Sequence, residues 1–228
     1  MESKITDLKS ALQPVKNGDT LMVGGFGLIG APLSLIDELT KLEVKELTVV
    51  SNNVGEAGKG LGILLDQGKL KKAIGSYFTS NREVAKWYNA DKLELQLLPQ
   101  GTLGEAIRAG GAGIGGFYTK TSVGTDLAKG KETKEIDGEE YVFEKALKSD
   151  VSLVRAHKAD KLGNLVYYKT ARNFNPMMAT AGKYVVAEVD EIVEVGELNP
   201  EEIATQHIYV DKLVLAEQIL TKEGVVQK

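Results

Sequence analysis

The first half of the chain alternates short apolar runs with longer amphipathic segments, and this alternation constrains the fold more than any other feature. The apolar runs have the length of strands and lie at 21–23, 47–50, 72–74 and 93–98. The amphipathic segments have the length of helices and lie at 32–42, 61–66, 82–89 and 103–108. Strands that alternate with helices form βαβ units, in which the strands pair in parallel and the helices cover the sheet. The sequence therefore predicts an α/β fold whose mostly parallel sheet is flanked by helices.

The second half of the chain is richer in strand-like segments. Residues 151–156, 165–168 and 183–189 carry β-branched and aromatic side chains and are expected to extend the same sheet. The stretch 110–116 is too rich in glycine to be helical, and 124–138 is polar enough for an exposed loop or hairpin. These two stretches leave room for a small β-rich excursion. Because no segment has the composition of a linker, residues 1–228 are predicted to form a single domain.

Composition excludes several classes of function. The chain has no cysteine, so disulfides, a catalytic thiolate and a cysteine zinc site are ruled out. Its 28 basic and 32 acidic residues give a net charge of −4, so no basic surface for nucleic acid is expected. The N-terminal residues lack the apolar core of a signal peptide, and no apolar run reaches membrane-spanning length. We therefore expect a cytoplasmic protein without a membrane partner.

A cluster of glycines joins the first predicted strand to the first long helix. The candidate ligand-binding residues are Gly24, Gly25, Phe26, Gly27, Leu28, Ile29 and Gly30. Glycine lets the backbone approach a ligand closely, and the helix that follows offers unpaired N–H groups to an anion. Such glycines can also serve only a tight turn. Because ligands of α/β proteins bind at the carboxyl ends of parallel strands, ligand binding is the favoured interpretation.

Three of these glycines spell the dinucleotide-binding pattern G-x-G-x-x-G, which needs an acidic residue at the end of the second strand. That strand ends instead in Ser51-Asn52-Asn53, and the nearest downstream carboxylate, Glu56, lies beyond a further glycine. The dinucleotide interpretation therefore loses its main support.

A longer pattern overlaps the same glycines. Residues 17–26 read N-G-D-T-L-M-V-G-G-F, and Gly30 and Pro32 follow. The chain here resembles the first signature of the coenzyme A transferases, which is Asn-Gly or Asp-Gly, two residues, three apolar residues, Gly-Gly-Phe and then Gly-x-Pro. The likeness continues through 98–103, 108–113, 117–119, 158–160, 163–164 and 171–176. It is strongest to the A subunits of short-chain 3-oxoacid and acetate CoA-transferases. One departure is Thr-Gln-His at 205–207, where the family pattern has Thr-Pro-Gly.

The resemblance implies a ping-pong transfer of CoA in which a glutamate carboxylate attacks the acyl-CoA thioester. It places that glutamate on a B subunit, in a Glu-Asn-Gly setting that this sequence lacks. Glu105 and Glu144 are accordingly expected to be surface charges. The implied assembly is an A2B2 heterotetramer with no permanent cofactor and no metal. Its substrates are CoA thioesters such as succinyl-, acetyl- or butyryl-CoA, and short-chain acids such as acetoacetate or acetate.

The candidate catalytic residue of this chain is Gln100, in a Pro-Gln-Gly turn after the fourth predicted strand. An amide side chain can donate a hydrogen bond to a developing oxyanion without acting as a nucleophile. In related enzymes the matching glutamine reaches the reacting acyl group. A turn glutamine bonded to backbone is the alternative.

Other polar residues leave their roles open. His157 and His207 have no second ligand at metal spacing, so surface or core roles are expected for both. Arg172 and Asn173 are compatible with binding a phosphate or a carboxylate, with a subunit interface and with capping a helix. Two other classes of protein share such a scaffold: a stand-alone nucleotide- or CoA-binding regulatory protein, and a phosphosugar isomerase, which would carry its own acid and base.

Overall fold

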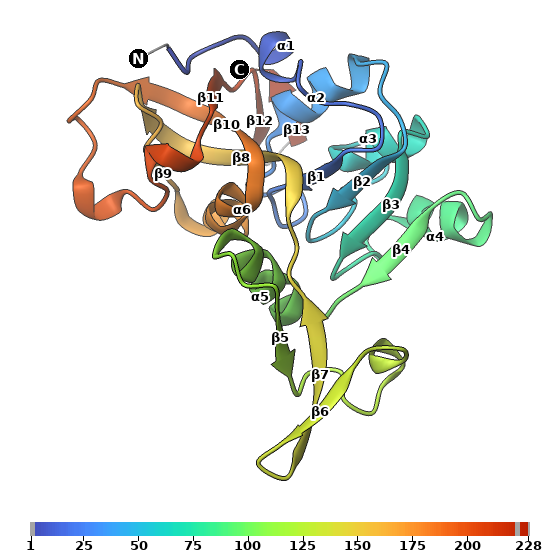
Figure 1. Ribbon diagram of the computed structural model, residues 1–228. Coiled ribbons are helices and arrows are strands. Elements are labelled where there is room, and N and C mark those ends of the chain that lie inside the picture. The colour runs from blue at the N-terminus through green and yellow to red at the C-terminus, as the bar shows by residue number, and fades with distance from the viewer. Residues whose placement is uncertain (1–2, 222–223, 228) are drawn as a thin grey trace.

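The computed structural model describes residues 3–221 and 224–227 (Figure 1). In these residues eight strands form the main sheet, in the order β11-β10-β8-β1-β2-β3-β4, with β9 paired to β8. Neighbours in this order pair in parallel, whereas β9 is antiparallel to β8. The strands are β1 (Thr20–Val23), β2 (Leu47–Val50), β3 (Leu70–Gly75), β4 (Glu94–Leu97), β8 (Ser149–Asp160), β9 (Leu165–Val166), β10 (Gly182–Val193) and β11 (Lys212–Leu215). The predicted parallel α/β fold is confirmed.

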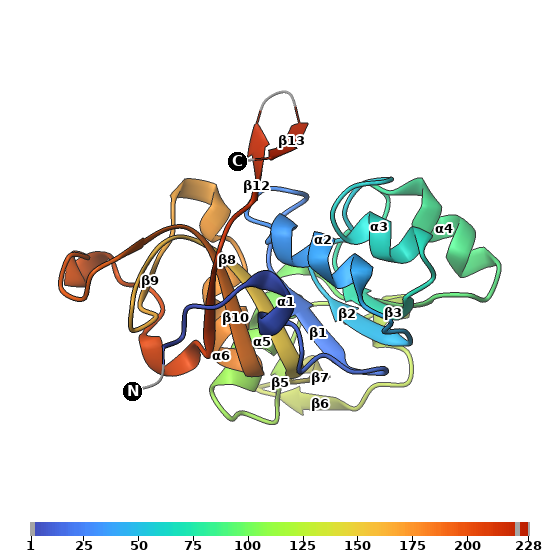
Figure 2. The same cartoon turned by 90° about the horizontal axis from the view of Figure 1, so that it is seen from above.

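Helices cover both faces of this sheet (Figure 2). They are α1 (Leu8–Ala11), α2 (Leu33–Lys41), α3 (Leu61–Asp66), α4 (Arg82–Asn89), α5 (Gln100–Gly111) and α6 (Asn175–Ala181). Each strand of the sheet alternates its side chains between the two faces. Leu21 and Val23 of β1 belong to the core that contains α1 to α4, while Met22 belongs to the core that contains α5 and α6. Because both faces of the sheet are buried, its strands are continuous apolar runs in the sequence.

Three antiparallel strands project from one end of the sheet as an arm (Figure 1). They are β5 (Gly116–Thr119), β6 (Thr133–Ile136) and β7 (Glu139–Lys145), paired in the order β5-β7-β6. This arm is the β-rich excursion that the polar stretch 124–138 suggested. The expectation that Glu144 is a surface charge is wrong. Its side chain is buried because Lys131, at the end of the loop before β6, covers it with an ion pair of 2.6 Å.

The glycine-rich stretch 110–116 was expected to contain no helix, and this is wrong for its first two residues. Helix α5 continues to Gly111. Glycine is needed at the end of this helix because neighbouring segments pack closely against it. A Cβ on Gly110 would lie 1.8 Å from the carbonyl oxygen of Leu147, and one on Gly111 would lie 2.1 Å from Oγ1 of Thr180. Close packing therefore overrides the cost of about 1 kcal/mol that each glycine imposes on a helix.

A short hairpin of β12 (Gln218–Thr221) and β13 (Gly224–Gln227) follows the last strand of the sheet. Its entry is fixed to the start of α2, where the hydroxyl of Ser34 accepts hydrogen bonds from the amides of Glu217 and Gln218, both at 2.9 Å. The hairpin thereby lies next to the carboxyl end of the sheet (Figure 2).

Candidate functional site

The glycine loop, residues 24–30, leaves the carboxyl end of β1 as a miniature hairpin. Phe26 and Ile29 exchange two backbone hydrogen bonds, of 2.9 and 3.2 Å. The loop can turn this tightly because Gly25, Gly27 and Gly30 adopt φ values of 126°, 62° and 70°. Side chains other than glycine rarely adopt such values. The predicted ligand-binding residues therefore form one compact loop at the sheet edge where α/β proteins bind ligands.

The tip of the loop presents unused donors. Within the described part of the chain, the amides of Gly27, Leu28 and Gly30 have no hydrogen-bond acceptor, whereas those of Gly24, Gly25 and Ala31 do. Backbone N–H groups are obligatory donors, and several close together in a turn form a concave site for an anion or a polarised carbonyl oxygen. The loop is thus equipped to bind an acceptor from outside the chain.

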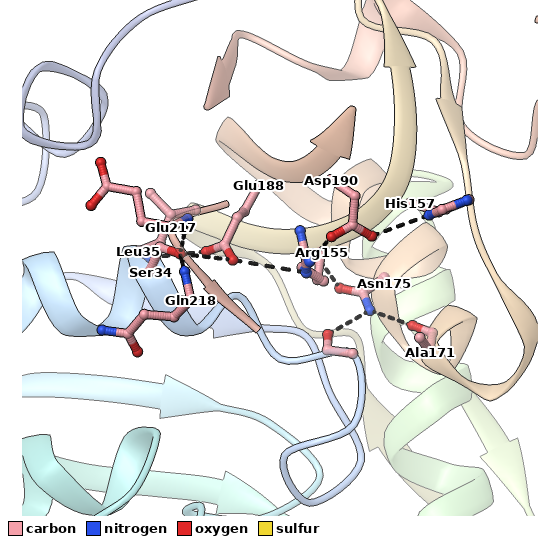
Figure 3. Close-up of polar contacts among 11 residues, drawn as sticks. Ser34, Leu35, Arg155, His157, Ala171, Asn175, Glu188, Asp190, Glu217 and Gln218 are labelled. Carbon is pink, nitrogen blue, oxygen red and sulfur yellow. Dashed lines mark hydrogen bonds and ion pairs between the residues drawn. The ribbon is translucent and has the colours of Figure 1, made fainter. Parts of the chain in front are cut away.

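A cavity of about 400 Å³ lies beside this loop. Leu28 to Ala31 form one wall, the tyrosines at 167 and 168 another, and strand β12 a third. Its charged or titratable polar side chains include those of Arg155, His157 and Asp190, which come from the carboxyl halves of β8 and β10 (Figure 3). Asp190 accepts from Arg155 and lies 3.1 Å from Nδ1 of His157. His157, for which a surface or core role was expected, is half-buried and lines the cavity beside this carboxylate.

Burial sets the charge of the acidic group next to Arg155. Glu188 is fully buried on β10, and burial raises the pKa of its carboxyl group to about 7. Its carboxylate lies 3.8 Å from Nε of Arg155 and accepts from the hydroxyl of Ser34 and the amide of Leu35, at 3.1 and 3.0 Å (Figure 3). These partners lower the pKa but do not cancel the desolvation. At neutral pH Glu188 is therefore divided between its charged and neutral forms.

We expect this raised pKa to make stability depend on pH through Glu188. The folded chain holds the proton more tightly than the unfolded chain, so the contribution is complete below the unfolded pKa of 4.5 and is lost as the pH rises through about 7. The shift corresponds to about 3 kcal/mol. Urea denaturation of wild type and Glu188→Gln at about pH 5 and pH 8 measures it. From about pH 5 to pH 8, the free energy of unfolding of wild type relative to that of the variant should fall by up to about 3 kcal/mol. A difference that does not depend on pH would rule the assignment out.

Gln100 lies at the same edge of the sheet but away from this cavity. It was expected in a turn and is instead the first residue of α5, directly after Pro99. Its side chain is exposed and makes no hydrogen bond to any described residue, so the alternative of a backbone-bonded turn glutamine has no support. Two strands, β2 and β3, separate β4 from β1. At about 4.8 Å per strand, Gln100 and the glycine loop are roughly 14 Å apart along the edge.

A second glycine loop, which the sequence analysis missed, follows β2 at residues 55–60. Glu56 and Lys59 exchange backbone hydrogen bonds of 3.3 and 3.0 Å, as Phe26 and Ile29 do 30 residues earlier. The two loops pack together, since a Cβ on Gly60 would lie 2.9 Å from a methyl carbon of Leu28. The available signal was the spacing G-x-x-G-x-G between the second strand and its helix.

The roles left open by the sequence are partly decided by contacts. Asn173 accepts a hydrogen bond from the amide of Gly25 and donates one to the carbonyl of Ile29, so its side chain holds the glycine loop. Asn53 accepts from the amide of Gly55 and forms a local turn.

In residues 3–221 and 224–227, no group of three or more His, Asp or Glu side chains is placed to hold a metal ion. Over the same residues, no helix has the length and apolar character of a membrane span.

The chain is similar to known proteins over nearly its whole length. The sequence model of the coenzyme A transferase family matches residues 5–216. The A subunit of succinyl-CoA:3-ketoacid coenzyme A transferase from Helicobacter pylori strain J99 is 51% identical over 218 residues, which cover 96% of this chain and 94% of that protein. The alpha subunit of acetate CoA-transferase from Escherichia coli K12 is 40% identical over 218 residues, which cover 96% and 99%. An acyl-CoA transferase from E. coli O157:H7, in a thioester complex with CoA, has the same fold, with a TM-score of 0.84 and 20% identity over 99% of this chain and 50% of that one.

The chain is an α/β protein with a parallel sheet, and its donor-rich glycine loop lies at the carboxyl edge, where ligands of such sheets generally bind. The family match extends over nearly the whole chain, and the chain therefore belongs to the coenzyme A transferase family. The expectation of a CoA-transferase chain of the A type, rather than the B type, is confirmed.

Proposed function

We propose that this chain is the A component of a heteromeric, A2B2 CoA-transferase. The enzyme would move CoA from a thioester such as succinyl-, acetyl- or butyryl-CoA to a short-chain acid such as acetoacetate or acetate. The observation that carries the proposal is the family match over residues 5–216, together with relatives named as subunits of 3-ketoacid and acetate CoA-transferases. No cofactor is needed permanently, because CoA itself is the group transferred.

The proposed reaction is a ping-pong exchange on a glutamate of the B subunit. Its carboxylate attacks the thioester carbonyl and releases CoA thiolate, leaving a mixed anhydride. The thiolate then attacks the glutamyl carbonyl, so the free acid leaves and CoA remains as an enzyme thioester. The acceptor acid reverses these steps with its own carboxylate. Dividing the exchange in this way replaces one difficult step by easier ones.

Two observations support a nucleophile outside this chain. The sequence has no Glu-Asn-Gly. Two buried glutamates are also already committed to internal contacts: Glu144 pairs with Lys131, and Glu188 accepts from Ser34 and Leu35. The E. coli O157:H7 transferase fits the same division, since this chain covers half of that longer chain and leaves the other half unmatched.

In this scheme the chain contributes donors rather than a nucleophile. The glycine loop, Gly24 to Gly30, would lie against the CoA thioester, with the free amides at its tip as donors. Gln100 would donate its side-chain amide to the oxygen that becomes negative during acyl transfer. The two contacts lie along one edge of the sheet, so an extended CoA thioester lying on that edge can meet both.

Mapping the covalent CoA adduct tests this division of labour. When the assembled enzyme is incubated with an acyl-CoA and no acceptor, mass spectrometry of the separated chains should find CoA bound only to the B subunit. Addition of acetate or acetoacetate should remove it. A CoA thioester on any glutamate of this chain would contradict the proposal.

A further inference from the structure

Both ends of the glycine loop rest on one buried side chain, that of Asn175. This residue begins α6 and is 0% exposed. Its Oδ1 accepts from the amide of Arg155 at 2.8 Å, and its Nδ2 donates to the carbonyls of Gly30 and Ala171 at 3.0 and 2.9 Å (Figure 3). The amide therefore connects strand β8, the loop and the turn before α6.

The start of the loop packs directly on the same amide. A Cβ on Gly24 would lie 1.8 Å from Oδ1 of Asn175, so only glycine fits there. At the other end, a Cβ on Gly30 would lie 2.4 Å from the carbonyl oxygen of Ala171, which Asn175 also holds. The entry and exit of the loop are thus fixed relative to each other by Asn175. The tip is held by the Phe26–Ile29 bonds and by the bond from the amide of Ala31 to the carbonyl of Leu28.

Asn173 provides a second, more peripheral support. It is half-buried, and its side chain binds the amide of Gly25 at 3.1 Å and the carbonyl of Ile29 at 3.0 Å. Its φ of 24° is unusual for a residue with a side chain. The two asparagines together engage the loop backbone at Gly25, Ile29 and Gly30, and they leave the amides of Gly27, Leu28 and Gly30 free for a ligand.

We propose that Asn175 is a positioning residue that holds the glycine loop in its ligand-accepting shape, with Asn173 as its auxiliary. A preorganised loop binds more tightly because its ordering cost is met before the ligand arrives. The role of this loop toward CoA rests on the proposed function, but the positioning of the loop can be measured without it.

Asn175→Asp is the main test, because aspartate is nearly the same size and keeps an acceptor for the amide of Arg155. It replaces the donor that faces Gly30, Ala171 and Oδ1 of Asn173 with an oxygen, so three hydrogen bonds are lost. Asn173→Ala is the second variant, at a position less buried in the core. Asn17→Ala is the matched control, since Asn17 also binds a backbone amide, that of Lys45, but is exposed and precedes β1.

Hydrogen exchange of the assembled enzyme, followed by mass spectrometry of peptides, reports the loop directly. In Asn175→Asp we expect the peptide covering 24–31 to exchange at least about tenfold faster, the effect of losing three hydrogen bonds at the low end of their usual strength. Peptides from β10 and α4 should be unchanged. Asn173→Ala should show a smaller effect at the same peptide, and Asn17→Ala none. The KM for the acyl-CoA should rise more than kcat falls.

The outcomes separate this inference from the proposed function. Faster exchange at the loop with a higher KM supports both. Faster exchange at the loop with unchanged kinetics supports the positioning role and removes the loop from the proposed CoA contact. Unchanged exchange at the loop overturns the inference, and so does faster exchange spread evenly over the chain in both variants, because the asparagines would then serve the whole fold.

Discussion

Gln100→Ala should form the enzyme–CoA thioester about 100-fold more slowly than the wild-type enzyme, with little change in KM. Loss of one oxyanion donor of this kind costs roughly 2.7–4 kcal/mol of transition-state stabilisation. The effect should appear in kcat because the hydrogen bond strengthens only as negative charge develops on the acyl oxygen. Gln100 is suited to this role because its exposed side chain has no hydrogen-bond partner among the described residues.

The position of Gln100 makes the substitution interpretable. Alanine favours helices, so replacing the first residue of α5 should leave the fold intact. Gln100→Glu should be slower still, since its carboxylate would repel the developing oxyanion, and the positive end of the α5 dipole favours the ionised form. Gln67→Ala is the matched control, because Gln67 is also exposed, follows the end of a helix and has no side-chain hydrogen bond to a described residue.

Single-turnover formation of the thioester on the assembled enzyme separates the chemical step from product release. Wild-type rates in Gln100→Ala would show that this glutamine has no part in the reaction. A rise in KM with unchanged kcat would instead assign it to binding of the substrate in the ground state.

Local signals in the sequence predicted the sheet and its helices well. Strand β2 and helices α3 and α4 have the predicted bounds, β1 begins one residue earlier, and α2 is shorter by one residue at each end. This succeeded because a strand buried on both faces is a continuous apolar run, and an amphipathic helix repeats every 3.6 residues. The glycine loop was likewise predicted because positive φ values need glycine whatever surrounds them.

Contacts between distant segments could not be predicted in the same way. Asn175 and Gly30 are 145 residues apart in the chain, and nothing local distinguishes this asparagine from one that caps a helix. From the sequence alone, the glycines at the end of α5 were expected to exclude a helix. Glycine is needed there because Leu147 and Thr180 pack closely against the helix. The burial of Glu144 depends in turn on Lys131 from the neighbouring loop. Each of these depends on tertiary packing, which overrides local preference.

The largest effect we expect is the dependence of activity on the partner chain. If the nucleophile belongs to the B subunit, this chain alone lacks the group that attacks the thioester. Removal of a catalytic nucleophile lowers kcat by at least about 10,000-fold. Without the partner, transfer should therefore be undetectable, although the sheet and glycine loop of this chain remain folded.

A matched partner variant distinguishes supply of the nucleophile from structural completion. A partner whose Glu-Asn-Gly glutamate is changed to alanine should still assemble with this chain, as size-exclusion chromatography with light scattering would show. The resulting complex should be as inactive as this chain alone. Activity in that complex would place the nucleophile elsewhere.

The most direct test is the rate of CoA transfer from succinyl-CoA or acetyl-CoA to acetoacetate or acetate, measured for the purified chain before and after addition of its B subunit. We predict no transfer above a heat-denatured control by the chain alone and full transfer once the partner is added. Turnover by the chain alone, or no gain when a correctly assembled wild-type partner is present, would contradict the proposed division of labour.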